Sequence, residues 1–185
     1  MRYLILALLL PLAAQADTTI SAVGVLSGDL GYETTGFGIQ LDHSNRHGNW
    51  GHALQGTALR QAKISGKGQR YQAIGMGRRF FGDWFVEAGA EWGGYTTDFP
   101  DGRQWSKYGH SFGGGIGVEH GGSTFTLRYF APDSTPNDTS MVIATAQFPL
   151  AGNWRGSVKV EQWWFDQGQN RLSGTMAVLG VGRNF

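Results

Sequence analysis

The sequence predicts an all-β fold, a closed antiparallel up-and-down β-barrel of about ten strands. Apolar and polar residues alternate with a period of two in segment after segment, as in strands with two different faces. The 30 glycines are interleaved with 24 aromatic residues (7 Trp, 6 Tyr and 11 Phe). Glycine-rich disordered chains are poor in aromatic residues, so this composition excludes disorder.

The first 16 residues have the layout of a secretory signal peptide. Arg2 supplies a positive charge, Tyr3 to Leu12 form a short apolar stretch, and Ala-Gln-Ala at the end fits a cleavage site. The apolar stretch is shorter than the about 20 residues that a membrane span needs. We therefore expect an exported protein in which residues 1–16 are removed and residues 17–185 form one barrel domain.

The composition of the expected mature chain excludes several classes of protein. Without Arg2 it has 14 basic residues (15 minus 1) and 14 acidic ones, so it carries no basic excess for binding nucleic acid. It has no cysteine, so neither a disulfide framework nor a thiolate site can form. Beyond the signal segment, no apolar run approaches the length of a transmembrane helix.

Turn signals divide the chain into ten alternating segments. An even number of strands places both ends of the chain on one side of a barrel. The first two segments alternate least clearly, so eight strands is the alternative. The predicted strands begin near Thr18, Thr34, Trp50, Gln69, Trp84, Ser106, Ser123, Ser140, Trp154 and Arg171.

Two segments show why the barrel is expected to span a membrane. From Trp84 to Trp92, and again from Trp154 to Trp164, one face is mainly apolar and has a tryptophan at each end. Such a segment spans roughly 20 Å when tilted, close to the apolar band of a transmembrane barrel with its aromatic girdles. Across the predicted strands the polar faces are rich in glycine and small residues, which suit a narrow lumen. A soluble periplasmic β-protein also alternates and is the alternative.

The connections differ in length. Gly82-Asp83, His120 to Gly122 and Leu150 to Asn153 are tight, whereas 97–104 and 131–139 are longer and rich in Pro, Asp and Ser. The stretch 43–49 is predicted to be a long turn, and the histidines His43, His47 and His52 to be exposed there. Their spacing fits no zinc pattern, so no metal site is expected.

Charged residues on the predicted inner faces are the candidate site. If Gly82-Asp83 is a two-residue turn, Phe81 faces Trp84 and Arg78 faces Glu87 across a hairpin. The charges are balanced, which favours a self-neutralising network that fills the lumen over a polar path for a solute. The predicted inner-face charges are Asp42, Arg78, Glu87, Glu91, Glu119, Arg128, Arg155, Lys159 and Glu161.

The closing segment "GVGRNF" resembles the last strand of Gram-negative outer-membrane barrel proteins, which commonly ends in phenylalanine, here Phe185. The stretches "YETTGFGIQL", "YFAPDS" and "GVGRNF" are similar to the YfaZ family of small outer-membrane proteins. The resemblance implies outer-membrane lipid and lipopolysaccharide as surroundings, and the barrel-assembly machinery and periplasmic chaperones as partners during biogenesis. It implies no activity, cofactor or functional residue.

We therefore expect a non-enzymatic role without a cofactor: structural, a narrow pore, or the binding of a small ligand. The alternative is a lipid-modifying enzyme, an acyltransferase or a deacylase. Glu119, His120 and Ser123 form the one grouping of serine, histidine and acid. It flanks a predicted periplasmic turn, on the wrong leaflet for surface lipid, so no catalytic residue is predicted.

Overall fold

The computed structural model describes residues 17–29, 35–63, 66–98, 104–131, 139–167 and 170–185. The predicted signal segment and most of the two longer predicted loops lie outside these residues. Within them, no helical stretch has the length and apolar character that crossing a membrane requires. The ten strands are β1 (Asp17–Asp29), β2 (Thr35–His47), β3 (Trp50–Lys63), β4 (Gly66–Phe81), β5 (Trp84–Asp98), β6 (Gln104–His120), β7 (Ser123–Phe130), β8 (Thr139–Pro149), β9 (Trp154–Gln167) and β10 (Asn170–Asn184).

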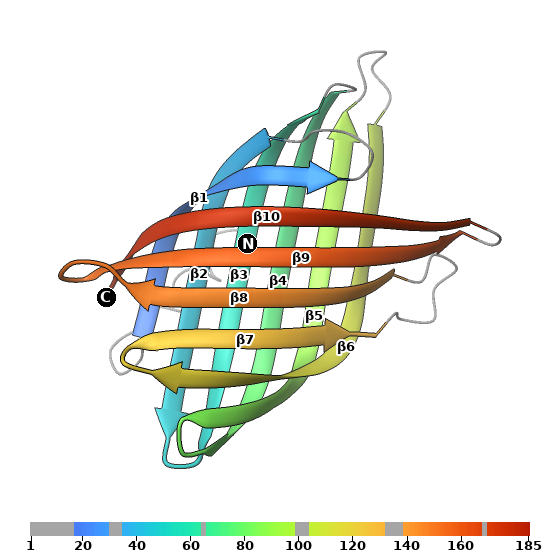
Figure 1. Cartoon of the computed structure of the whole chain (residues 1–185). Coiled ribbons are helices and arrows are strands. Elements are labelled where there is room, and N and C mark those ends of the chain that lie inside the picture. The colour runs from blue at the N-terminus through green and yellow to red at the C-terminus, as the bar shows by residue number, and fades with distance from the viewer. Residues whose placement is uncertain (1–16, 30–34, 64–65, 99–103, 132–138, 168–169) are drawn as a thin grey trace, which may run out of the picture.

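The strands form one closed antiparallel barrel. Each strand pairs with its neighbours in sequence, and β1 pairs with β10 to close the ring, with Val23 opposite Gly180. The predicted barrel is therefore confirmed, with ten strands and not eight. The largest difference between a predicted and an observed start is at β4, with Gln69 predicted and Gly66 observed. In Figure 1, β7–β10 cross in front of β2–β5 at a steep angle, like the near and far walls of a barrel with tilted strands.

Tight turns join the strands at one end of the barrel, the short-turn end. Gly48, Gly82, Gly121, Gly122 and Gly152 have φ between 58° and 77° there, a conformation that costs glycine little. Both ends of the described chain also lie here, since the Phe185 N–H donates a hydrogen bond to the Thr18 carbonyl over 2.9 Å. The predicted long turn at 43–49 is wrong, because β2 continues to His47 and only two residues turn the chain.

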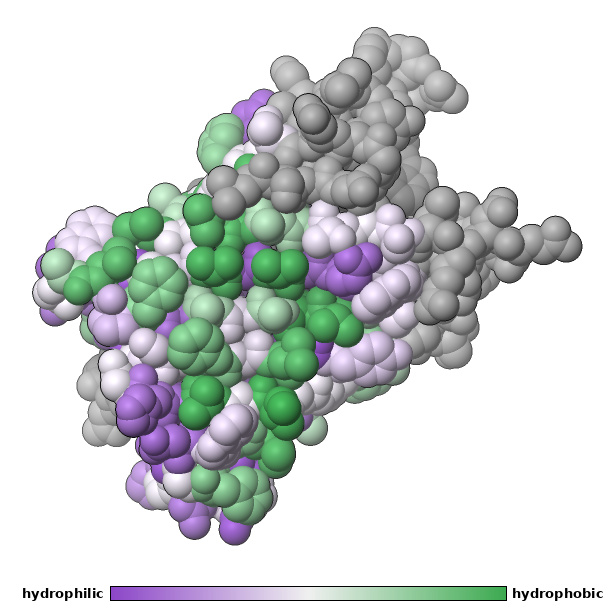
Figure 2. Space-filling view, in the orientation of Figure 1, coloured by the Kyte–Doolittle hydropathy of each residue, from purple (hydrophilic) through white to green (hydrophobic). Residues whose placement is uncertain are grey.

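The exterior of the barrel is apolar. Large hydrophobic side chains that point outward are exposed on every strand except β8, which contributes the exposed Ala144. Trp84, for example, is 61% exposed. Figure 2 shows hydrophobic side chains spread across the face formed by β7–β10. The outward set includes Ile20, Phe37, Ile39, Trp50, Tyr71, Phe81, Val86, Trp92, Phe112, Ile116, Phe125, Leu127, Tyr129, Trp154, Val160, Leu179 and Val181, and we call it the exterior belt.

The interior holds both polar and apolar side chains. Most of the buried polar and charged residues lie on the inner faces, in register with one another across the strand pairs. A second, apolar set is also buried inside the barrel, which the alternation alone did not distinguish. It consists of Val23, Val25, Leu59, Ile74, Met76, Phe130, Met141, Ile143, Trp163, Met176 and Val178, and we call it the apolar plug.

Glycine makes room for this filling. A Cβ atom on Gly117 would lie 2.2 Å from the ring of Phe85, so a larger residue on this stretch of β6 would displace a buried ring. At Gly89 a Cβ atom would lie 1.9 Å from the carbonyl oxygen of Gly75 on the neighbouring strand β4. Both contacts are closer than real Cβ atoms approach. Glycine therefore lets the strands and their inner side chains pack closely at these two places.

Candidate functional site

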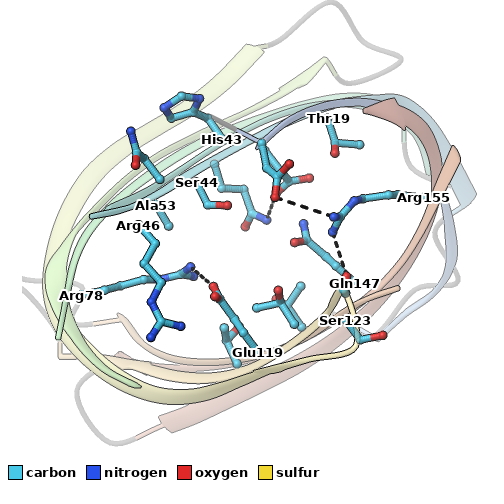
Figure 3. Close-up of a pocket in the computed structure, with 18 of the residues that line it drawn as sticks. Thr19, His43, Ser44, Arg46, Ala53, Arg78, Glu119, Ser123, Gln147 and Arg155 are labelled. Carbon is cyan, nitrogen blue, oxygen red and sulfur yellow. Dashed lines mark hydrogen bonds and ion pairs between the residues drawn. The ribbon is translucent and has the colours of Figure 1, made fainter. Parts of the chain in front are cut away.

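The lumen has an open and a closed part. The open part is a cavity of about 740 Å³ at the short-turn end, which we call the vestibule. Its lining is polar and includes Thr19, Asp42, Ser44, Gln55, Arg78, Glu119, Thr126, Arg128, Thr145, Gln147 and Arg155 (Figure 3). A volume of this size lies within the range of ordinary ligand pockets. The vestibule is therefore the candidate binding site of the molecule.

The apolar plug closes the lumen beyond the vestibule. Phe130 and Ile143 face the lumen from neighbouring strands and are 0% exposed, so no water-sized sphere touches them. The other plug residues are less than 9% exposed. Protein interiors of this kind are packed as densely as organic crystals. The plug residues therefore fill the lumen at this level of the barrel.

The first charge network lies at the inner boundary of the vestibule. The Glu87 carboxylate accepts a hydrogen bond from Arg78 Nε at 2.9 Å and from Arg128 Nε at 2.5 Å. Arg78 also donates to Glu119 over 3.3 Å, a pair drawn in Figure 3. Its guanidinium lies over the Phe85 ring, 4.3 Å from the centroid. Two arginines and two carboxylates therefore neutralise one another here.

The second charge network is buried beside the plug. The Glu161 carboxylate contacts Arg70 Nη2 at 2.5 Å and Lys159 Nζ at 2.9 Å, and it is fully buried. Lys159 also donates to Gln72 Oε1 over 3.2 Å, and Gln72 in turn donates to Glu91 over 3.4 Å. Removing either partner of a buried ion pair leaves an uncompensated charge, which is strongly destabilising. This network therefore helps the apolar plug to close the lumen.

Asp42 has only amide partners, as Glu91 does, but unlike Glu91 it lines the vestibule. Gln40 Nε2 donates to its Oδ2 and Gln55 Nε2 to its Oδ1, each over 2.7 Å. Within the described part of the chain, no cationic side chain lies within 4.0 Å of this carboxylate. Asp42 therefore presents an uncompensated negative charge to the vestibule.

The two remaining vestibule arginines are held near the rim. Arg155 donates to the Gly122 carbonyl over 3.2 Å, and its Nη2 lies 3.8 Å from Asp17. Arg46 donates to the carbonyl oxygens of Gly48 and Gly82, with its guanidinium 4.2 Å from the centroid of the Phe80 ring. Neither arginine is paired with Asp42.

The structure places the predicted lumen charges on the inner faces, but in two separate groups. Arg78, Glu87, Glu119 and Arg128 form the first network, whereas Lys159, Glu161 and Glu91 belong to the second. The second group depends on Arg70 and Gln72, which the sequence reasoning missed. Both lie on the same face of β4 as Arg78, so counting back from Arg78 in steps of two would have found them.

The predicted girdle tryptophans lie outside the barrel. Trp84 and Trp154 begin strands at the short-turn end, whereas Trp92 and Trp164 lie further along β5 and β9. Arginines accompany the aromatic residues at the short-turn end: Arg79 lies 4.5 Å from the Trp50 ring centroid, and Arg183 lies 5.7 Å from that of Phe185. Aromatic rings with neighbouring cations suit the level of lipid headgroups.

The histidines are not turn residues, which corrects the expectation for His43 and His52. His43 lies within β2 and is only 7% exposed, and its ring stacks on that of His52 in β3 with centroids 5.4 Å apart. Its Nδ1 is 3.0 Å from Thr18 Oγ1 and its Nε2 is 3.3 Å from His52 Nε2. The expectation failed because β2 continues to His47, through most of the predicted turn, and β3 begins at Trp50, so His43 and His52 face each other on paired strands. His47 ends β2 and is exposed.

The serine, histidine and acid grouping does not form a catalytic arrangement. His120 is exposed and its Nδ1 lies 3.0 Å from Asp83 Oδ2, whereas Glu119 points the other way, into the vestibule toward Arg78. Ser123 is paired in register with His120 across the turn. In the described segments no group of three or more histidine or carboxylate side chains is placed to hold a metal ion.

The structure is similar to several solved β-barrels at low sequence identity. The N-terminal β-barrel domain of Pseudomonas aeruginosa OprF aligns over 92% of this chain and 98% of its own, with 15% identity and a TM-score of 0.46. The Yersinia pestis outer membrane protein Ail aligns over 92% of this chain and 99% of its own, with 15% identity and a TM-score of 0.40.

The anion-selective porin from Comamonas acidovorans aligns over 82% of this chain, with 11% identity and a TM-score of 0.42. This chain spans about half of the porin's length, 49%. No protein-family model matches the sequence, and the comparison with curated proteins gives no match. What the barrel does therefore has to be inferred from its own lumen and exterior.

Proposed function

We propose that the chain is an integral outer-membrane β-barrel protein with a closed lumen and a non-enzymatic role, structural and solute-binding. The observation that carries the proposal is the inverted distribution of side chains. Charged residues such as Glu161 and Lys159 are buried inside, and large apolar residues such as Phe37 and Phe112 are exposed outside. In lipid this arrangement is favourable, because the exterior belt meets acyl chains and a closed ring leaves no unpaired strand edge.

A soluble protein does not tolerate such a surface. The largest exposed apolar patch of a soluble monomer is ordinarily a few hundred Å². Here exposed apolar side chains go round the barrel, and they include aromatic residues such as Trp84 and Trp92. The alternative of a soluble periplasmic β-protein is therefore not favoured.

The proposed orientation follows from the turns. In bacterial outer-membrane barrels the short turns face the periplasm and the longer loops face outward. The tight turns at Gly48-Asn49, Gly82-Asp83 and Gly121-Gly122 lie at the short-turn end. In this orientation the vestibule opens to the periplasm and the apolar plug separates it from the cell surface. The role of a through-pore is accordingly not proposed.

The same proposal includes export by the signal segment and contact with lipopolysaccharide. It also includes handling by periplasmic chaperones and by the barrel-assembly machinery. So does membership of the YfaZ family, which rests on the short sequence stretches alone. The C-terminal Phe185 supports recognition by the assembly machinery, since its ring is exposed at the proposed periplasmic end.

Fractionation and gel mobility test the membrane location. We expect the protein to stay with outer membranes through an alkaline carbonate wash and to run at different apparent masses before and after boiling. Release into the soluble fraction, with identical mobility of heated and unheated samples, would refute the proposal.

Planar-bilayer recording tests the closed lumen. Refolded protein that shows heat-modifiable mobility should give no discrete conductance steps. A double variant, Phe130→Ala with Ile143→Ala, removes two fully buried plug side chains and should allow conductance. Thr126→Ala with Thr145→Ala is a matched control on the same two strands, because it removes vestibule side chains only. Stable steps from the unaltered protein would overturn the closure.

A further inference from the structure

The vestibule contains a charge and several hydrogen-bonding atoms that the protein does not satisfy. Asp42 has two amide donors and no cation among the described side chains. The residue is half-buried and lines the cavity, so it is open to a ligand there. A carboxylate of this kind at the wall of a cavity can be neutralised by a positively charged ligand.

The arginines of the vestibule do not make it an anion site. Arg78 and Arg128 are neutralised by Glu87 and Glu119, and Arg155 lies beside Asp17. Arg46 has no carboxylate partner, but it lies near the rim, where it donates to the Gly48 and Gly82 carbonyls. Deeper in the vestibule, an anion would meet cations that are already paired with carboxylates and the negative charge of Asp42.

Three buried polar atoms on residues that line the vestibule also have no hydrogen-bond partner. They are Gln55 Oε1, Thr126 Oγ1 and Thr145 Oγ1, on side chains that are 7–8% exposed and line the vestibule. Gln55 donates to Asp42 through its nitrogen, so its free oxygen belongs to the same amide that holds the carboxylate. Thr126 and Thr145 are opposite each other on β7 and β8. Leaving a buried polar group without a partner is costly, and a polar ligand that supplies the partner removes this cost.

We propose that the vestibule binds a small solute that carries an ammonium group and hydroxyl groups. The ammonium donates to the Asp42 carboxylate. Gln55 Oε1 and the hydroxyls of Thr126 and Thr145 are buried within the wall, so these side chains rotate toward the cavity to bond the ligand. An ammonium fits better than a metal ion, since among the described residues Asp42 does not belong to any group of three or more carboxylates and histidines that could hold a metal ion. The cavity of about 740 Å³ accommodates a ligand as large as an amino sugar. This proposal rests on the proposed function in that the solute is expected to enter from the periplasm.

Calorimetric titration of the refolded full barrel in detergent micelles tests the proposal with three probes of similar size. Glucosamine carries an ammonium and hydroxyls, glucose carries hydroxyls only, and glucuronate carries a carboxylate. We expect glucosamine to bind saturably, glucose at least tenfold more weakly, and glucuronate not at all. Equal binding of glucose and glucosamine, or tighter binding of glucuronate, would overturn the proposal.

Two variants and a control locate the site. Asp42→Asn should weaken glucosamine binding at least tenfold, and Thr126→Val with Thr145→Val should weaken it several-fold. Asp83→Asn is the control, since that carboxylate lies in a turn at the same end and pairs with His120 outside the lumen. An unchanged affinity in Asp42→Asn would place the ligand elsewhere and refute the assignment.

The folding of each sample is read independently from its heat-modifiable mobility. A protein that never shows this shift contradicts the proposed barrel in the membrane, whereas a folded barrel that binds none of the probes contradicts only the solute site. If Asp42→Asn does not fold, the comparison of glucosamine with glucose on the unaltered protein still decides the proposal.

Discussion

The two parts of the lumen are built on the same ten strands and differ in what fills them. On β8, Ile143 belongs to the plug, whereas Thr145, two residues further along the same face, lines the vestibule. On β7, Phe130 and Thr126 make the same contrast. Strand number alone therefore does not decide whether a barrel is open. The volume of the inner side chains at each level decides it.

Two carboxylates, one in each part of the lumen, also differ in their partners. Beside the plug, Glu161 is fully buried and bound by two cations, while in the vestibule Asp42 is bound by amides alone. A fully buried carboxylate has no water to stabilise it and needs cationic partners. A carboxylate beside a hydrated cavity does not depend on them.

The largest expected effect is the loss of the buried carboxylate in Glu161→Gln. Arg70 and Lys159 would keep their charges without the carboxylate that both contact, which costs about 3–5 kcal/mol of unfolding free energy. Urea unfolding in lipid vesicles, followed by tryptophan fluorescence, measures it. A loss below about 1 kcal/mol would mean that water reaches this network.

Two truncations on β8 compare the stability contribution of a plug residue with that of a vestibule residue on the same strand. Ile143→Ala should lower the unfolding free energy by about 2–5 kcal/mol, since it leaves a void in a densely packed region. Thr145→Ala should not lower it, because the hydroxyl that it removes has no hydrogen-bond partner and the side chain borders the cavity. Equal losses in the two variants would contradict the division of the lumen.

Two glycines test how closely the wall packs. Gly89→Ala should cost about 1–3 kcal/mol, because the new Cβ would meet the Gly75 carbonyl oxygen at 1.9 Å and the strands must shift. Gly56→Ala is the matched control, as nothing lies within 4 Å of its Cβ position. The two variants are compared by the temperature midpoints of their gel-mobility transitions. An unchanged midpoint in Gly89→Ala would show that β4 and β5 can move apart without a loss of stability.

The smallest expected effect is that of Asp42→Asn on stability. The substitution removes a charge that has no cationic partner among the described residues, so the unfolding free energy should change by about 1 kcal/mol or less, without the loss expected for Glu161→Gln. Paired urea titrations of the two variants measure the contrast directly. A loss as large as that of Glu161→Gln would reveal a cation near Asp42 outside the described residues.

The sequence was sufficient to predict the strands, their faces and the β4–β5 register. Period-two alternation set the faces, and a two-residue turn at Gly82-Asp83 set Arg78 opposite Glu87, as the structure has them. Contacts across the lumen could not be predicted in this way. Arg70 meets Glu161 although 91 residues separate them, and such a meeting depends on the tilt and shear of the closed barrel, which no local pattern records.

The division into plug and vestibule was missed for the same reason. The inner faces were expected to be rich in glycine and small residues, whereas large residues such as Phe130 and Trp163 gather on them as one plug. Which inner residues share one level of the barrel depends on the stagger of all ten strands. The His43–His52 stack was missed because a cluster of polar residues near Gly48 was assigned to a turn.

The pairing of β1 with β10 has a consequence for how the molecule forms. Thr19 and Asn184, which share a hydrogen bond at this seam, are 165 positions apart in the chain. Until β10 arrives, any partly assembled sheet has two open edges that can pair with another chain. Contacts between such distant residues also make folding slow. The ring therefore closes last, and the growing sheet needs protection from aggregation until its first strand meets its final one.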